Sequence, residues 1–164
     1  MTDTPMGIPI VYEDNHLLVA VKPAGVLSQA DGSDAPDMLT LLKADLKIRH
    51  NKPGNVFLGL VHRLDRPVGG VMVFARTSKG ASRISAQIRA HAFEKEYLAV
   101  VHGQPPAEAG TLRGLLVKDA STGTASAAAD GETGKEAVLH YRLVSSKPDR
   151  QAALLLVRLE TGRA

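Results

Sequence analysis

The chain has 164 residues, of which 44% are hydrophobic and 4% aromatic, and it carries 20 Lys and Arg against 17 Asp and Glu. This composition fits one globular domain with an aliphatic core, and the net charge of +3 permits a polyanionic partner without requiring one. The lack of cysteine excludes disulfides, thiolate catalysis and cysteine-ligated zinc. The sequence shows no signal peptide and no apolar run near the roughly 18 residues of a membrane span, so we expect a cytoplasmic protein.

The N-terminal half predicts strands that alternate with two helices. Aliphatic and β-branched runs between turn residues predict strands over residues 8–13, 17–22, 56–64 and 70–75. Apolar residues at helical spacing predict helices over residues 38–46 and 79–92. Asp37 is expected to cap the first helix, and Thr77 or Ser78 the second, because these side chains accept hydrogen bonds from the first free amides.

The C-terminal half predicts strands without helices. The expected strands cover residues 95–102, 112–117, 137–144 and 152–159. Between them, residues 119–135 are rich in Ala, Ser, Thr and Gly, and they are expected to form a mobile loop or a loose hairpin tip. Together the elements predict an α+β fold with a mixed, mostly antiparallel sheet and flanking helices.

Charged residues gather where two apolar runs meet, in the segment His62-Arg63-Leu64-Asp65-Arg66. Arg63 and Asp65 are two positions apart, so in extended backbone their side chains point to the same side. Pro67 and the glycines after it favour a turn. The pattern predicts a carboxylate that is presented to a ligand beside guanidinium groups. For this segment alone, an ion pair at the end of a strand is the alternative.

This segment resembles the H-R-L-D signature of RluA-type RNA pseudouridine synthases. Lys22-Pro23-Ala24-Gly25 is similar to the family's K-P-x-G element, and Lys95-Glu96-Tyr97 is similar to its K-x-Y element. Residues 159–163 resemble the start of its C-terminal L-x-T-G-R element. Four motifs in the same order, within a matching pattern of strands and helices, make the resemblance specific. It implies the family's fold, in which an active cleft crosses a central sheet.

The sequence departs from the family's pattern in two places. Val68-Gly69 stand where the family has Thr or Ser followed by Ser, which should change turn packing more than chemistry. The sequence ends at Ala164, inside the fourth motif and before the family's His-Gln-Ile-Arg, whose arginine pairs with the catalytic aspartate. We therefore expect residues 1–9 to be a tail with no S4 module, and residues 10–164 to be a C-terminally incomplete catalytic domain.

The resemblance implies isomerisation of uridine to pseudouridine in ribosomal or transfer RNA, without a cofactor or a metal. Asp65 is then the catalytic carboxylate, which either attacks the anomeric carbon or removes the ribose 2′ proton. Arg63 is implied to help displace the target base. Tyr97 is implied to stack on the uracil and to help move the carbon-5 proton. From the residues alone, Tyr97 could also be a core aromatic and Arg63 a phosphate contact.

Further candidates for contacts with substrate or RNA are His62, Arg66, Lys95, Arg163 and Lys22. For His62 we expect a structural hydrogen bond, because in a strand it faces away from Asp65. Lys22 is expected to shape the loop under the site, with a phosphate contact as the alternative. A positive surface toward RNA is a further hypothesis, with simple solvated charges as its alternative. Its candidate residues are Arg49, His50, Lys52, Arg66, Lys79, Arg83 and Arg89.

Of two other functions, one fits the sequence and the other does not. Without the family's C-terminal arginine Asp65 is left unpaired, so the chain could be a catalytically impaired RNA-binding fragment of such an enzyme. A glycoside hydrolase needs two carboxylates, and the sequence offers no second acid in a comparable setting. The histidines lack the spacing of a metal site, and we expect a monomer.

Overall fold

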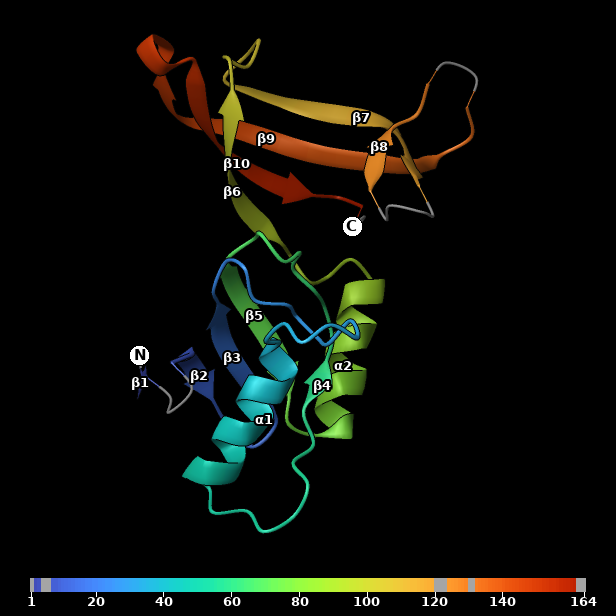
Figure 1. The fold of residues 1–164 in the computed structure, drawn as a ribbon. Coiled ribbons are helices and arrows are strands. Elements are labelled where there is room, and N and C mark those ends of the chain that lie inside the picture. The colour runs from blue at the N-terminus through green and yellow to red at the C-terminus, as the bar shows by residue number, and fades with distance from the viewer. Residues whose placement is uncertain (1, 4–6, 120–123, 130–131, 162–164) are drawn as a thin grey trace. The chain divides into compact units, whose positions relative to one another are not determined.

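The computed structural model describes residues 2–3, 7–119, 124–129 and 132–161. The chain divides into two compact units, Met1–Ala92 and Phe93–Ala164, each with its own antiparallel sheet (Figure 1). The α+β fold expected from the sequence is confirmed. No helix among the described residues is long and apolar enough to cross a membrane.

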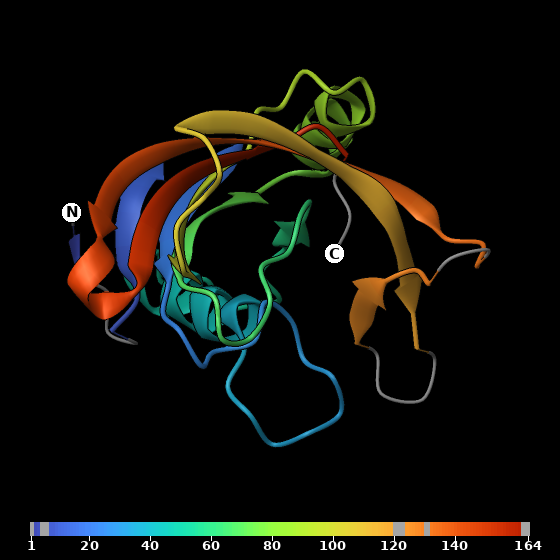
Figure 2. The same cartoon turned by 90° about the horizontal axis from the view of Figure 1, so that it is seen from above.

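The first unit is a five-stranded antiparallel sheet with a helix on each face. Its strands are β1 (Thr2–Asp3), β2 (Pro9–Glu13), β3 (Leu17–Lys22), β4 (Gly59–Leu60) and β5 (Gly70–Ala75), in the spatial order β1-β2-β3-β5-β4. Its helices are α1 (Met38–Arg49) and α2 (Ser78–Arg89). Figures 1 and 2 show the two helices on opposite sides of β3 and β5.

The main core of the first unit lies between α1 and the sheet. Leu42 and Leu46 of α1 are buried against Leu18, Met72 and Phe74. Leu18 of β3 pairs directly with Phe74 of β5, so the two side chains stand on the same face of the sheet. This face carries large aliphatic and aromatic side chains, and their burial is the main stabilising contribution of the unit.

The other helix, α2, is fixed to the turn between β2 and β3. The Thr77 side chain caps the helix by accepting a hydrogen bond from the amide of Gly80. A Cβ atom at Gly80 would lie 2.9 Å from the carbonyl oxygen of His16, so only glycine fits this contact without a shift. Ala81 lies near β4, where a Cβ at Gly59 would be 3.4 Å from its methyl group. These contacts set the position of α2 along the sheet.

The second unit is also a five-stranded antiparallel sheet. Its strands are β6 (Glu96–His102), β7 (Ala109–Lys118), β8 (Ala125–Ala127), β9 (Lys135–Lys147) and β10 (Ala152–Leu159), in the spatial order β6-β10-β9-β7-β8. The 3-10 helix η1 (Pro148–Arg150) joins the last two strands. Tyr141, Ala153 and Leu155 form its small buried core, which is packed by half-buried aliphatic side chains.

Two expected elements differ from the structure. The strand predicted over residues 56–64 is wrong except at Gly59–Leu60, because the backbone after β4 bonds to side chains instead of to a neighbouring strand. Within the predicted loop of residues 119–135, β8 pairs with β7 to extend the sheet. Residues 120–123 and 130–131 of that segment lie outside the described residues.

The expected division into a tail and one catalytic domain stays a prediction, and two observations of the structure bear on it. Thr2 and Asp3, within the predicted tail, pair with Ile10 and Pro9 of β2. The segment that was predicted to form a single domain contributes to two compact units, which meet in the chain at residues 92 and 93. Asp65 belongs to the first unit, whereas Lys95 and Tyr97 belong to the second.

Candidate active site

The H-R-L-D segment lies in irregular backbone between β4 and β5, and its first residue is tied to β5. The Nε2 atom of half-buried His62 accepts a hydrogen bond of 3.0 Å from the backbone amide of Val73. As the acceptor in this contact, Nε2 carries no proton. This is a structural hydrogen bond of the kind that the sequence predicted for His62, and it anchors the residue before Arg63.

The third residue of the segment is held by a serine that the sequence analysis did not single out. The hydroxyl group of Ser28 donates to the carbonyl oxygen of Leu64 at 2.6 Å and accepts from the Leu64 amide at 3.0 Å. Ser28 is 4% exposed, so both hydrogen bonds are shielded from water. A single side chain thus replaces the strand partner that Leu64 lacks, directly before Asp65.

Asp65 begins a tight turn that rests on a buried ammonium group. The Val68 amide donates to the Asp65 carbonyl oxygen at 3.0 Å and closes the turn. Nζ of Lys22, whose side chain is fully buried, lies 2.6 Å from the carbonyl oxygen of Val68 and 3.2 Å from those of Arg66 and Pro23. Three backbone carbonyls therefore satisfy the three donors of the Lys22 ammonium group.

The two N-terminal motifs also interlock through their backbones. The Gly25 amide donates to the Arg66 carbonyl oxygen at 2.8 Å, and Nε of Arg66 donates to the Gly25 carbonyl oxygen at 3.1 Å. Gly69 passes so near to the K-P-x-G segment that a Cβ atom there would lie 3.4 Å from the Ala24 nitrogen and the Lys22 oxygen. The K-P-x-G element therefore packs against the Asp65 turn and supports it through hydrogen bonds.

The side chains of Arg63 and Asp65 are exposed, in contrast to the backbone that carries them. Among the described residues they do not form an ion pair with each other, so the structure lacks the strand-end pair that was the alternative interpretation. Burial lowers the pKa of Lys22, and the charge of Asp65 opposes that shift. The arrangement offers an accessible carboxylate on a rigid turn with a buried cation behind it.

The candidates Lys95 and Tyr97 are positioned by the sheet of the second unit. Tyr97 is half-buried in β6 and pairs with Val157 of β10. The Lys95 carbonyl oxygen accepts a hydrogen bond from the Leu159 amide at 3.4 Å. After β10, the hydroxyl oxygen of Thr161 accepts from the amide of Val138 at 2.9 Å. Arg163, the remaining candidate, lies outside the described residues.

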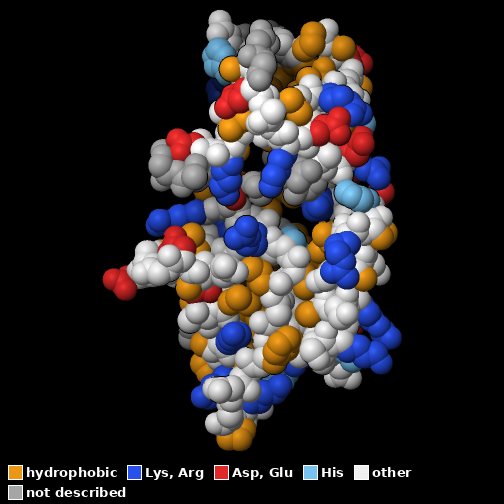
Figure 3. Space-filling model, turned by 90° about the vertical axis from the view of Figure 1, so that its right-hand side faces the viewer, with side chains coloured by type: hydrophobic (Ala, Val, Ile, Leu, Met, Phe, Trp, Pro, Cys, Tyr) orange, Lys and Arg blue, Asp and Glu red, His pale blue; other side chains and the backbone are white. Residues whose placement is uncertain are grey.

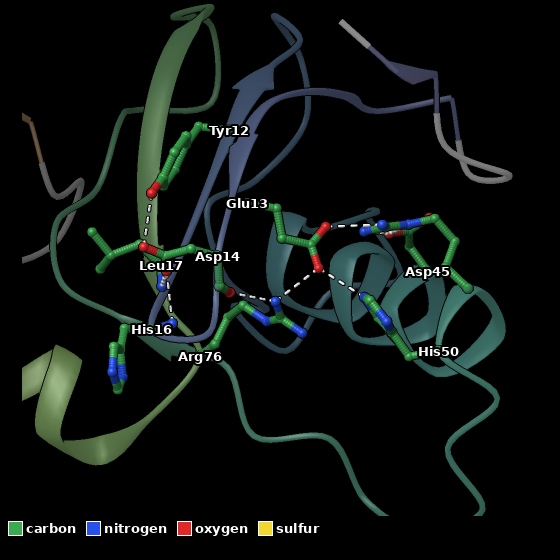
Figure 4. Close-up of polar contacts among 9 residues, drawn as sticks. Tyr12, Glu13, Asp14, His16, Leu17, Asp45, His50 and Arg76 are labelled. Carbon is green, nitrogen blue, oxygen red and sulfur yellow. Dashed lines mark hydrogen bonds and ion pairs between the residues drawn. The ribbon is translucent and has the colours of Figure 1, made fainter.

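A separate polar cluster joins β2, α1 and the end of β5 (Figure 4). Glu13 accepts contacts from Arg49 at 2.8 Å, His50 at 2.7 Å and Arg76 at 2.9 Å, and Arg49 also pairs with buried Asp45. Burial alone would raise the pKa of Glu13, but the hydrogen bonds from His50 and Arg49 and the two arginine charges lower it. Arg49 and His50, which were candidates for an RNA surface, are thus engaged within the fold.

This cluster lies at the opposite end of the sheet from Asp65. Leu17, next to the turn that follows Glu13, pairs with Ala75, whereas Lys22 at the other end of β3 pairs with Gly70, which follows the Asp65 turn. The Glu13 cluster therefore stabilises the fold at a distance from the candidate active site.

The described residues offer no second site of comparable chemistry. They contain no group of three or more His, Asp or Glu that could hold a metal ion. A cavity of about 370 Å³ lies within the second unit, and its lining from β7, β8, β9 and β10 is almost wholly aliphatic and contains no carboxylate. Among the described residues, the exposed Asp65 carboxylate, on the turn that Lys22 holds, is therefore the best candidate for a catalytic group.

Sequence reasoning found the motif residues but missed what holds them. Ser28 lay in a segment predicted to be a simple polar loop, and no motif pointed to it. Lys22 was named as a contact residue or a structural one, and the structure places its charge inside the unit. The available signal for that buried position was a lysine directly after the apolar residues 17–21, in the same strand.

Comparisons with known proteins place this arrangement among relatives. Residues 16–164 match the profile of a family described as RNA pseudouridylate synthase. Ribosomal large subunit pseudouridine synthase D of Zymomonas mobilis is 35% identical over 163 residues, which cover 97% of this chain and 50% of that protein. The tRNA pseudouridine synthase C of Haemophilus ducreyi is 39% identical over 98 residues, which cover 60% of this chain and 38% of that protein.

A solved structure agrees with these relatives. The structure titled human RNA pseudouridylate synthase domain containing 4 matches with a TM-score of 0.76 and 25% identity, over 94% of this chain and 59% of that chain. The chain spans about half the length of the curated relatives that it matches over most of its own length.

Proposed function

Because the chain belongs to the RNA pseudouridylate synthase family, we propose that it isomerises uridine to pseudouridine in RNA, with Asp65 as the catalytic carboxylate. One observation carries the proposal. The Asp65 carboxylate is exposed, while His62, Ser28 and Lys22 hold the backbone on both sides of it. Catalysis requires such an accessible group on a fixed support, since the carboxylate must keep its position while the base moves.

The reaction rearranges bonds within one nucleotide. The bond between ribose carbon 1′ and uracil nitrogen 1 breaks, the base turns, and a new bond forms between carbon 1′ and carbon 5. Carbon 5 then loses its proton and nitrogen 1 gains one, so the product has the atoms of the substrate. The protein must supply a carboxylate at the sugar, a surface for the freed base and a group that moves the carbon-5 proton.

Asp65 can act on the sugar in either of two ways. As a nucleophile it attacks carbon 1′ while the base leaves; as a base it removes the proton on carbon 2′. Both roles need the ionised carboxylate in direct contact with the ribose. The exposed position of Asp65 leaves its side chain accessible for such a contact.

We propose roles for the other motif residues by analogy with the family. Arg63, two positions before Asp65 and also exposed, is assigned to the displacement of the target base from its stack. Tyr97 is assigned to stack on the freed uracil and to help transfer the carbon-5 proton. His62 and Lys22 support the turn, and Arg66 fixes it through Gly25. Lys95 and Arg163 are assigned to contacts with the substrate RNA.

The substrate class is ribosomal or transfer RNA, since the relatives reported above carry both kinds of name. We place the reaction in the cytoplasm and expect a monomer to perform it. The test is to incubate the chain with ribosomal RNA and tRNA transcripts, digest them to nucleosides and measure pseudouridine by chromatography. Pseudouridine in one of the two RNAs supports the proposal and identifies the class. Binding of RNA without any pseudouridine would support the alternative of an RNA-binding protein without catalysis.

A further inference from the structure

The segment around Asp65 is almost free of acids and rich in cations. From residue 46 to residue 93, Asp65 is the only Asp or Glu. The Lys and Arg of the same segment are Lys47, Arg49, Lys52, Arg63, Arg66, Arg76, Lys79, Arg83 and Arg89. Figure 3 faces the side of the molecule on which α2 lies in Figure 1, and over the first unit it shows many more basic than acidic side chains. Such a field attracts a polyanion.

The structure shows which of these cations are in ion pairs within the fold and which are not. Arg49 and Arg76 are paired with Glu13 near α1. Lys79, Arg83 and Arg89, by contrast, are all exposed on α2, and none of the three is in an ion pair within the part of the chain that the structure describes. Lys47, Lys52, Arg63 and Arg66 are exposed and outside the ion pairs of the described residues as well, but α2 is the element that carries three such cations.

The stability of α2 does not explain these charges. The helix contains no acid, and its first turn carries Lys79, where the positive end of the helix dipole repels a cation. Lys79 and Arg83 are four residues apart, a spacing at which like charges destabilise a helix. Only Arg89, in the last turn, is placed favourably for the dipole. Two of the three cations therefore weaken the free helix, and an anionic partner would relieve that cost.

The topology of the first unit places the C-terminal end of α2 near the Asp65 turn. β5 starts at Gly70, directly after the Asp65 turn, and ends at Ala75, and α2 then packs against β5 and β4 in the return direction (Figures 1 and 2). Six strand residues and twelve helix residues have similar lengths, about 20 Å and 18 Å, at their usual rises. The Arg89 end of α2 therefore returns to the level of the Asp65 turn.

We propose that the exposed face of α2, with Lys79, Arg83 and Arg89, binds the phosphate backbone of the RNA strand that flanks the target uridine. The inference rests on the proposed function for the identity of the polyanion. The three cations lie along the length of the helix, so a strand that follows them arrives at the end of the sheet where Asp65 is exposed. The contacts are to phosphates, and they position the strand without reading its sequence.

The test compares two triple variants that lose the same charge. The first is Lys79→Gln/Arg83→Gln/Arg89→Gln. The matched control is Lys43→Gln/Lys47→Gln/Lys147→Gln, which removes three exposed lysines, two from α1 and one from β9. The probe is a fluorescein-labelled single-stranded RNA of about 20 nucleotides, and its affinity is measured by anisotropy over a series of salt concentrations. Circular dichroism checks that each variant is folded, and Arg83→Gln alone serves as a milder substitution.

We expect the α2 variant to bind at least about tenfold more weakly at low salt, and its slope of log affinity against log salt to fall by about 2, as three lost phosphate contacts require for a single strand. The control should keep the slope of the unchanged chain. Equal weakening in both variants, an unchanged α2 variant, or no binding by the unchanged chain would overturn the proposal. Binding is measured without catalysis, so RNA that binds through α2 but is not isomerised would reject the proposed reaction and leave this surface standing.

Discussion

The ammonium nitrogen of Lys22 lies 2.6 Å from the carbonyl oxygen of Val68, a residue 46 positions later in the chain. This contact joins the K-P-x-G element to the turn that Asp65 begins, and it is made by a fully buried side chain. A buried charge is stable only when its donors are satisfied, and here backbone carbonyls satisfy them. The geometry of the candidate active site therefore depends on a residue that need not touch RNA.

Substitution of Lys22 should destabilise the first unit and disturb the Asp65 turn. Lys22→Met keeps an apolar stem of similar size but removes the ammonium group that donates to the carbonyl oxygens of Pro23, Arg66 and Val68, and we expect a loss of about 3 kcal/mol in the free energy of unfolding. Urea denaturation measures it. Lys43→Met, on the exposed side of α1, is the matched control and should change stability by less than about 0.5 kcal/mol. Equal midpoints for the two variants would contradict the role given to Lys22.

The Ser28 hydroxyl should matter for the same turn. Ser28→Ala removes one donor and one acceptor from the half-buried backbone of Leu64, which should cost about 2 kcal/mol in the free energy of unfolding. Thermal or urea unfolding gives the value. Ser82→Ala, at an exposed position of α2, should be neutral or slightly stabilising because alanine favours helices. If Ser28→Ala were as stable as Ser82→Ala, the two hydrogen bonds to Leu64 would have no structural weight.

The Glu13 cluster should make stability depend on pH. The pKa of Glu13 lies below its ordinary value of 4.5, so the folded chain holds this proton less tightly than the unfolded chain. The stabilisation by the ionised carboxylate is therefore complete above about pH 4.5, and it is lost as the pH falls through the folded pKa. Glu13→Gln should cost about 2 kcal/mol at pH 7, with a smaller difference from the unchanged chain below pH 4.5.

Urea midpoints between pH 7 and pH 3 measure this dependence. Glu108→Gln, at an exposed position of the second unit, provides a comparison in which the difference from the unchanged chain should stay small at every pH. A Glu13→Gln difference that did not shrink on acidification would mean that the Glu13 charge is not what stabilises the cluster.

Gly80 should resist a substitution that normally stabilises helices. Alanine is favoured over glycine inside a helix by about 1 kcal/mol. At this position, however, the added Cβ would lie 2.9 Å from the carbonyl oxygen of His16, which belongs to the backbone and cannot rotate away. We expect Gly80→Ala to lower the free energy of unfolding by about 1 kcal/mol net, as overpacking does. A stabilised Gly80→Ala variant would show that α2 is not fixed closely to the β2–β3 turn.

The motifs allowed the family to be predicted from the sequence, and the comparisons confirm it. The α+β class and both caps, Asp37 and Thr77, were also correct, because local patterns determine them. The prediction of a strand over residues 56–64 failed because an apolar run does not reveal whether a neighbouring strand is available. The Ser28 hydroxyl takes the place of that neighbour at Leu64, and a contact between residues 36 positions apart leaves no local signal.

The charged residues show the same limit. A sequence lists cations but does not say which are neutralised, so Arg49 and Lys79 were equivalent candidates for an RNA surface. The fold pairs Arg49 with Asp45, one turn earlier on the same helix, and with Glu13, which is distant in the sequence. It leaves Lys79 exposed. The roles of Asp65, Arg63 and Tyr97 in catalysis stay predictions, since they concern contacts with a substrate.

Release of tritium from RNA labelled at carbon 5 of uridine tests the central claim most directly, because each isomerisation frees that hydrogen. The chain is compared with Asp65→Asn and with Asp34→Asn, an exposed aspartate in another loop of the first unit. We expect release by the chain and by Asp34→Asn at similar rates, and a loss of at least about 1000-fold in Asp65→Asn with RNA binding retained. Release by Asp65→Asn at the rate of the unchanged chain would contradict the assignment of Asp65 as the catalytic carboxylate.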